Sequence, residues 1–227
     1  MPRLAGNFKL DMKITQTAGG IAHTNSFLIA DETAGKAVIF DAPDNTVFPL
    51  IQHAKDQGWD IIGLWLTHGH FDHVADHLVV TGHFPQAKVL IHRLDEPKLL
   101  DPNPTMFRLP FKIAARAADG YLEEGQELKL GSLTAKVLFT PGHSPGHVMF
   151  HFPEQKILVG GDLIIGGAVG RTDFPDSDHA ALEASIRRVM QLPPDTTLLP
   201  GHGDPSHLSD ELRNNPYVQE AMEGAEG

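Results

Sequence analysis

Short apolar runs in the first part of the chain predict β-strands. Two such runs, Ser26–Ile29 and Ala37–Phe40, are joined by a polar stretch, which is typical of a hairpin with a longer loop. Ile61–Leu66 is a continuous apolar run, which is typical of a strand that is buried on both faces. Another strand is expected at Ala87–Ile91. Residues 1–45 are therefore expected to be rich in β-structure, and further strands follow them.

Other segments carry their apolar residues at helical spacing. In residues 46–57 these residues recur three and four positions apart, which predicts an amphipathic helix. Asp44 or Asn45 is placed to cap the start of this helix, and Gly58 is placed to end it. A second helix is expected near residues 73–82. Helices and strands therefore follow one another closely in this part of the chain.

The second half of the chain begins with an irregular segment. Residues 93–120 carry four prolines, which break any long helix, and a loop of this length is usually functional or mobile. Regular structure then returns, with strands predicted near 126–130, 134–140, 147–152 and 156–160, a helix over about 178–192, a strand at Thr197–Leu199 and a closing helix at Ser206–Arg213. No linker or repeat divides the chain. We expect a single α/β domain over residues 1–227, with mixed sheets covered by helices.

Composition narrows the chemistry that is open to this chain of 227 residues. It has no cysteine, which excludes disulfides, thiolate nucleophiles and sulfur-ligated metal clusters. Its formal net charge of −11 argues against binding to nucleic acid or to anionic membranes. No apolar stretch is long enough to span a bilayer, and residues 1–9 lack the apolar block of a secretory signal. A cytoplasmic protein is therefore expected.

The chain contains 14 histidines, and three of them lie together. Directly after the apolar run Ile61–Leu66, residues 67–73 read Thr-His-Gly-His-Phe-Asp-His. This is the carboxyl end of a predicted strand, where α/β folds place their functional sites. Histidine is the commonest metal ligand in proteins, so the cluster indicates a metal site. Its candidate ligands are His68, His70, Asp72 and His73.

Three more candidate ligands occur in the same kind of position. His143, Asp162 and His202 each follow a predicted strand and lie beside a glycine, which permits a tight turn. The seven residues together are too many for one tetrahedral ion and suit two adjacent ions that share a carboxylate and a solvent molecule. We therefore expect two divalent metal ions per chain. Ligands without sulfur suit zinc, iron(II) or manganese(II), and zinc is our first expectation, although ligand type alone does not decide among the three.

With these motifs the chain resembles the metallo-β-lactamase superfamily, and within it the small bacterial type of glyoxalase II, a hydroxyacylglutathione hydrolase. The similarity extends from about Asn25 to about Tyr217 and includes Gly-Gly-Asp at 160–162 and Gly-Arg-Thr-Asp-Phe at 170–174. The resemblance implies an αββα sandwich, in which helices flank two mixed β-sheets. It also divides the ligands between the ions, giving His68, His70 and His143 to one, Asp72, His73 and His202 to the other, and Asp162 to both.

The resemblance also implies a reaction. A metal-bound hydroxide would attack a thioester carbonyl, so the expected substrate is S-D-lactoylglutathione or a related hydroxyacyl thioester, a small molecule linked to glutathione. Asp72 is expected both to bind metal and to orient the hydroxide, and Arg171 aligns with a basic position that contacts substrate in larger relatives. The eukaryotic-type enzyme appends a helical domain that binds glutathione, whereas only 25 residues follow His202 here, so the thiol specificity stays open.

Other functions remain open on the same ligands. A persulfide dioxygenase would use one iron(II) held by His68, His143 and Asp162. A lactonase or a phosphodiesterase would use the dinuclear centre. A metal-free binding module would be expected to lack a ligand, and none of the seven is missing. β-Lactam hydrolysis is not expected, because secreted β-lactamases of the superfamily replace the bridging aspartate and carry a signal peptide.

Some residues outside the ligand set are expected to support the site. Asp41 follows a predicted strand and is expected to brace the metal-binding loops, and His147 is expected to have a structural role beside the ligands. In the irregular segment, Arg108, Lys112 and Arg116 form a basic stretch without an acidic residue. Our hypothesis is that this stretch guides an anionic substrate towards the site.

Overall fold

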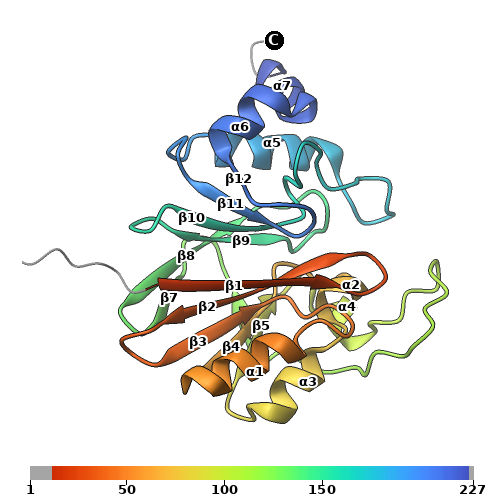
Figure 1. Cartoon of the computed structure of the whole chain (residues 1–227). Coiled ribbons are helices and arrows are strands. Elements are labelled where there is room, and N and C mark those ends of the chain that lie inside the picture. The colour runs from red at the N-terminus through yellow and green to blue at the C-terminus, as the bar shows by residue number, and fades with distance from the viewer. Residues whose placement is uncertain (1–11, 225–227) are drawn as a thin grey trace, which may run out of the picture.

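The computed structural model describes residues 12–224, and these form two six-stranded sheets that pack face to face (Figure 1). The first sheet contains, in spatial order, β1 (Met12–Gly19), β2 (Thr24–Asp31), β3 (Lys36–Phe40), β4 (Asp60–Trp65), β5 (Lys88–His92) and β6 (Gly120–Leu122). The second contains β12 (Ser206–His207), β11 (Thr197–Pro200), β10 (Ile157–Gly161), β9 (Val148–Phe152), β8 (Leu133–Phe139) and β7 (Glu127–Leu130). Residues 1–9, in which we predict no secretory signal, lie outside the described part.

Helices cover the outer side of each sheet, which gives four layers (Figure 1). The first sheet is covered by α1 (Phe48–Gln57) and α3 (His77–His83), with α2 (Phe71–Val74) and α4 (Glu96–Leu100) at one end. The second sheet is covered by α5 (His179–Val189), α6 (Leu208–Asn214) and α7 (Pro216–Glu223). The predicted αββα sandwich is therefore confirmed. None of the helices within residues 12–224 has the length and apolar character needed to cross a bilayer.

Both sheets mix parallel and antiparallel pairs, as predicted. β3, β4, β5 and β6 are parallel neighbours, and β10 and β11 form a parallel pair in the second sheet. Parallel strands end at the same edge of a sheet, so the loops that follow them leave the fold together. The space between the sheets is filled by aliphatic and aromatic side chains, among them Phe40 and Phe150, whose ring centroids are 5.1 Å apart.

Some elements differ from the sequence-based prediction. The helix predicted near 73–82 is instead α2 and α3, because backbone groups around the break bond to another loop: Ala42 N donates to His73 O, and Asp76 N donates to Ala42 O. The predicted cap of α1 by Asp44 or Asn45 is wrong, since Val47 is the N-cap and no side chain bonds there. Gly58 does end α1, in the left-handed conformation with φ 71°.

Candidate metal centre

The seven predicted ligands meet at one end of the sandwich, although they are far apart in sequence. Each lies shortly after a strand: His68 and His70 lie in the loop after β4, Asp72 and His73 lie in α2, and the other three lie in the loops after β8, β10 and β11. Their side-chain nitrogen and oxygen atoms form groups within 4.8 Å of one another. These groups are His68 with His70 and His143, His68 with His73 and Asp162, and Asp72 with His73 and His202.

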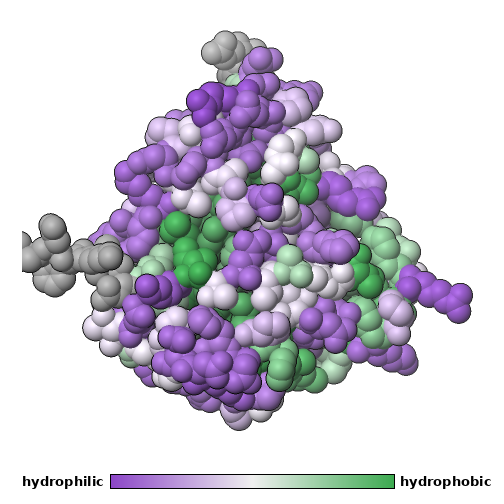
Figure 2. Space-filling model, in the orientation of Figure 1, coloured by the Kyte–Doolittle hydropathy of each residue, from purple (hydrophilic) through white to green (hydrophobic). Residues whose placement is uncertain are grey.

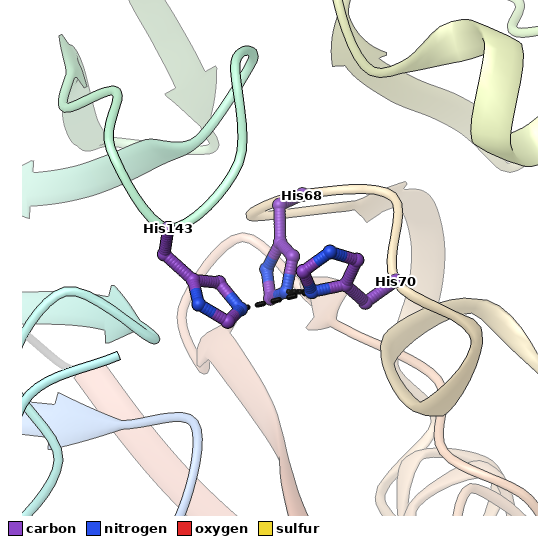
Figure 3. A group of neighbouring side chains, drawn as sticks. All are labelled: His68, His70 and His143. Atoms are coloured by element: carbon purple, nitrogen blue, oxygen red, sulfur yellow. Dashed lines mark hydrogen bonds between the residues drawn. The ribbon is translucent and has the colours of Figure 1, made fainter. Parts of the chain in front are cut away.

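The first group brings three imidazole rings to one point (Figure 3). His70 Nδ1 lies 3.0 Å from His68 Nε2 and 2.8 Å from His143 Nε2. The rings come from two loops, the one after β4 and the one after β8, and they point towards one another (Figure 3). His68 and His143 are buried, so these nitrogens have little access to bulk water.

The second group faces the first across a shared carboxylate. Asp72 Oδ2 lies 3.5 Å from the Nε2 atoms of both His73 and His202. Asp162 lies between the groups: its Oδ2 is 3.5 Å from His143 Nε2 and 3.3 Å from His202 Nε2, and its Oδ1 is 3.4 Å from His73 Nε2. Asp162 therefore lies between the two groups, where a carboxylate that bridges two ions would lie.

Hydrogen bonds on the outer sides of the rings show that these residues fit metal ions. His143 Nδ1 donates to the backbone oxygen of Arg171, an acceptor only, so its Nε2 carries a lone pair. His68 Nδ1 donates to Thr67 Oγ1, whose own proton goes to Asp41, so His68 Nε2 also carries a lone pair. Lone pairs that converge repel one another unless a cation lies between them.

Two buried polar atoms support the same conclusion. His73 Nε2 and Asp162 Oδ1 have no hydrogen-bond partner among the described residues, although both are shielded from solvent. Buried polar atoms are almost always paired, so an orphaned pair in a ligand cluster indicates a missing cation partner. The donor set therefore fits divalent metal ions.

The electrostatics of the cluster also favour cations. Burial would lower the pKa of His73, but Asp162, Asp72 and Asp41 outweigh it and raise that pKa well above its ordinary value. Burial and the neighbouring His143 lower the pKa of His70 to about 4. The second group thus attracts positive charge, whereas His70 stays neutral and keeps a lone pair available for a metal.

A family model described as the metallo-beta-lactamase superfamily matches residues 19–202 of the chain. The chain belongs to this superfamily. Among its curated relatives is the hydroxyacylglutathione hydrolase GloC of Haemophilus influenzae, which is 33% identical over 203 residues; the alignment covers 86% of this chain and 92% of the relative. The matched region contains all seven candidate ligands.

Solved structures of the superfamily align with nearly the whole chain. The BLEG-1 B3 metallo-beta-lactamase is 31% identical with a TM-score of 0.83, over 91% of this chain and 99% of that one. TTHA1623 in a di-iron-bound form is 34% identical with a TM-score of 0.74, over 89% and 99%. ETHE1 from Myxococcus xanthus is 25% identical with a TM-score of 0.77, over 93% and 88%. These similarities confirm the fold, and one of the three structures is a di-iron-bound form.

The predicted bracing role of Asp41 is confirmed by its contacts. Asp41 Oδ1 accepts from the backbone N–H of Thr67, and Oδ2 accepts from Thr67 Oγ1 and from His73 Nδ1, each at 2.8 Å. The residue has a φ of 56°, which a non-glycine residue adopts rarely and which aims its carboxylate at the ligand loop. Asp41 therefore fixes both the start of the loop and the orientation of the His73 ring.

His147 supports the bridging residue, as the sequence analysis expects. Its Nε2 accepts from the backbone N–H of Asp162 at 3.0 Å, and its Nδ1 donates to Thr140 Oγ1 at 2.8 Å. Burial and the neighbouring His143 lower its pKa to about 3, so the ring is neutral and remains an acceptor. His147 thus orients Asp162 through the backbone.

Sequence reasoning missed Asp95, which is fully buried between two ligand loops. Its Oδ2 accepts from Gly69 N at 2.8 Å and from Ser144 Oγ at 2.7 Å, and its Oδ1 accepts from Gly146 N at 2.7 Å. Burial alone would raise the pKa of Asp95, but Lys98 and these hydrogen bonds outweigh it and lower that pKa. The available signal was its position just after β5, beside the strand that carries the histidine cluster.

Sequence reasoning also missed Thr24 and Asn25, which begin β2. Thr24 Oγ1 donates to Asp72 Oδ2 at 2.8 Å. Asn25 Nδ2 donates to the backbone oxygens of Pro200 and Gly203, on either side of His202. The two bonds of Asn25 join the first sheet to the loop that carries His202, and the bond of Thr24 joins it to Asp72.

A pocket of about 460 Å³ opens beside the ligands. It is bordered by the ligands themselves, by the loop between α4 and β6, and by the segment around Arg171. Arg171 lines the pocket but forms two hydrogen bonds of 2.5 Å to Asp173, and its guanidinium lies 4.5 Å from the Phe174 ring. Its role as a substrate ligand stays a prediction.

The basic stretch predicted to guide substrate is part of that same loop, and it is not helical. Arg108 and Lys112 are exposed, whereas Arg116 pairs with Asp119 at 2.6 Å. Asn103 closes the base of the loop by two hydrogen bonds to the backbone of Ile113, at 2.8 and 2.9 Å. The loop projects from the end of the sandwich (Figure 1), and the outer edge of the molecule on that side is strongly hydrophilic in the same view (Figure 2), so its two exposed cations lie on a protrusion.

Proposed function

We propose that this protein is a metal-dependent thioesterase that cleaves S-D-lactoylglutathione or a related hydroxyacyl thioester at a dinuclear centre. The observation that carries the proposal is the position of Asp162 between two groups of ligands, beside a pocket large enough for a small molecule. The similarity to the hydroxyacylglutathione hydrolase of Haemophilus influenzae supports the substrate class.

Each group of ligands would hold one divalent ion, with zinc as the expected metal. His68, His70 and His143 would bind one ion, and Asp72, His73 and His202 the other, with Asp162 bound to both. When bound, the ions would polarise the thioester carbonyl and lower the pKa of a water molecule towards neutrality. No side-chain nucleophile is needed in that chemistry, which is consistent with a chain that has no cysteine.

The chain's own residues would then position the reactants. Asp72 is held by Thr24 through one oxygen and is partly exposed to the pocket, so it can accept a hydrogen bond from the attacking water and orient it. Arg171 and Asp173 form an exposed pair, and exposed pairs are weak, so a substrate carboxylate can displace Asp173 from Arg171.

The test is hydrolysis of S-D-lactoylglutathione, followed by the loss of thioester absorbance, with protein whose bound metals have been counted. We expect turnover by the unmodified protein. Asp162→Ala and His70→Ala should each abolish turnover and should each lower the metal content of the protein. The matched control is His207→Ala, which removes an exposed histidine on β12 that belongs to none of the ligand groups, and it should change neither value. Full activity in either ligand variant would contradict the site assignment.

A mononuclear iron(II) persulfide dioxygenase is the second candidate. It would use only His68, His143 and Asp162, and would give the second group of ligands no function. The gathered side chains of Asp72, His73 and His202 therefore favour the hydrolase. One tightly bound iron per chain, with oxygen uptake on glutathione persulfide and no thioester cleavage, would reverse the order.

Lactones and a chromogenic cephalosporin complete the substrate panel. A lactonase would use the same two groups of ligands, and the BLEG-1 B3 metallo-beta-lactamase shares the fold. The proposal expects thioester cleavage to exceed turnover of either class, measured as kcat/KM on one metal-loaded preparation. We propose further that the substrate is a small molecule and that neither nucleic acid nor a membrane is a partner, since the net charge is −11.

A further inference from the structure

Three phenylalanines form one wall of the pocket beside the candidate metal ligands, and we call Phe71, Phe107 and Phe174 the aromatic wall. The Phe174 ring lies 5.0 Å from the His70 ring and 5.9 Å from the His143 ring, in edge-to-face geometry. The wall therefore begins directly at the first group of ligands. A carbonyl bound there would place one of its two substituents close to these rings.

The projecting loop completes the wall. Phe107 lies on this loop, and its ring is 5.4 Å from Phe71 and 6.3 Å from Phe174. Phe107 and its neighbour Met106 line the pocket, yet their exposed fractions are 36% and 59%. Large apolar side chains that stay exposed around a cavity mark a binding surface, because a ligand that covers them removes their apolar area from water.

The lysine and the arginine that line the pocket are each held by a carboxylate in the free protein. Lys98 Nζ lies 2.6 Å from Asp176 Oδ2 and 3.3 Å from Asp95 Oδ1, and Arg171 is paired with Asp173. Every lysine and arginine in the described lining of the pocket is thus already in an ion pair. Phe107, by contrast, keeps 36% of its area exposed beside the pocket, so its apolar surface is available to a ligand.

We propose that the aromatic wall selects hydroxyacyl thioesters whose acyl group carries a large apolar substituent, such as an aromatic ring. This inference rests on the thioesterase proposed above and names its acyl specificity. In the reaction, a water oxygen forms a bond to the carbonyl carbon and the C–S bond breaks. The products are a carboxylate, a free thiol and one proton, so no other reactant is needed. Phe107 and Phe174 determine the specificity by contact with the acyl group.

The experiment compares S-D-mandeloylglutathione with S-D-lactoylglutathione on metal-loaded protein. The two thioesters share the thiol and the α-hydroxyl group and differ in a phenyl against a methyl substituent. Each kcat/KM is divided by the rate constant for hydroxide-catalysed hydrolysis in solution, which removes the difference in intrinsic reactivity. We expect the mandeloyl thioester to be preferred about tenfold or more, since a single buried methylene already discriminates about tenfold.

Variants of the wall test whether these rings carry the preference. Phe107 lies on an exposed loop, so the Phe107→Ala variant should fold. Both Phe107→Ala and Phe174→Ala should bring the ratio of the two kcat/KM values close to one, and neither should change the metal content. Phe48→Ala is the matched control, because Phe48 is an exposed phenylalanine on α1, outside the pocket lining, and should leave the ratio unchanged. Equal kcat/KM values in the unmodified protein, or a preference that survives both wall variants, would overturn the inference.

Binding of the free acids tests the aromatic wall independently of the proposed reaction. If neither thioester is cleaved by metal-loaded protein, the proposed function is wrong, but calorimetry with mandelate and lactate still tests the wall. The inference expects mandelate to bind about tenfold more tightly than lactate, and expects Phe107→Ala to remove the difference. Equal dissociation constants for the two acids would overturn it whatever the reaction is.

Discussion

Replacing Asp95 by alanine tests how this fold holds two ligand loops together. The carboxylate accepts from Gly69 N, which lies between His68 and His70, and from Ser144 Oγ and Gly146 N in the loop of His143. All three donors are buried, so Asp95→Ala leaves three buried donors without an acceptor. Each such donor costs about 1–3 kcal/mol, and the free energy of unfolding should therefore fall by about 3 kcal/mol or more.

The same substitution should weaken metal binding. Residues that position metal ligands typically change metal affinity about 10–100-fold when they are removed. Urea unfolding of metal-stripped protein measures the change in the free energy of unfolding, and competition with a zinc-binding dye measures the change in zinc affinity. Asp95→Asn keeps one carbonyl oxygen as an acceptor, so both values should be intermediate.

Asp56→Ala is the control for the Asp95 variants. Asp56 is exposed on α1 and bonds only Gln52 through its side chain, so its loss should change the free energy of unfolding by less than about 0.5 kcal/mol. If Asp95→Ala behaves like this control in both assays, the loops are held by other contacts and the reasoning is refuted.

Three further predictions concern other residues. His147→Ala removes the acceptor for the Asp162 N–H and should lower zinc affinity about tenfold in the dye competition assay, and an unchanged affinity would count against its role. Changing Arg108, Lys112 and Arg116 together to glutamine should flatten the salt dependence of kcat/KM, and an unchanged dependence would refute substrate guidance. Burial alone would raise the pKa of Asp31, but Ser132 and Ala34 donate hydrogen bonds to its carboxylate and lower that pKa. The ionised carboxylate therefore stabilises the fold above its unfolded pKa of about 3.9, and this stabilisation is lost as the pH falls through the lower pKa of the folded state. Asp31→Asn should therefore reduce stability at neutral pH and flatten the acid dependence of urea unfolding, and identical acid slopes would disprove this account.

The convergence of the seven candidate ligands could be predicted from the sequence because its signal is local. Four of them lie within six residues directly after the buried β4, and the other three each follow a strand beside a glycine. The ends of β4, β8, β10 and β11 meet at one end of the sandwich, so the position of a residue along its own strand was enough to predict that it joins the others.

The roles of Asp95, Thr24 and Asn25 could not be predicted, because they depend on distant partners. Asp95 precedes the short helix α4 and occupies its N-cap, where an aspartate normally bonds to its own helix. Its side chain makes no cap bond and instead contacts Ser144 and Gly146, 49 and 51 residues away. Its position just after β5 indicates that it lies near the site, but no local pattern indicates these two contacts.

The sequence analysis names no strand at β1, the edge strand of the first sheet, and the reason is again physical. β1 is an outer strand with residues that are exposed or only partly buried, so it lacks the apolar run that predicts a central strand. Its partner β2 is buried along its whole length, and that strand was predicted. Burial on both faces of a strand therefore produces an apolar run in the sequence, whereas an edge position does not.

The most direct test of the central claim is the dependence of thioester cleavage on metal loading. Protein stripped by a chelator is reconstituted with zinc from zero to three equivalents per chain, and S-D-lactoylglutathione hydrolysis is measured at each point. Because Asp162 lies between two complete groups of ligands, activity should rise until two equivalents are bound and then stay constant. Saturation at one equivalent, or no hydrolysis at any loading, would contradict a dinuclear thioesterase.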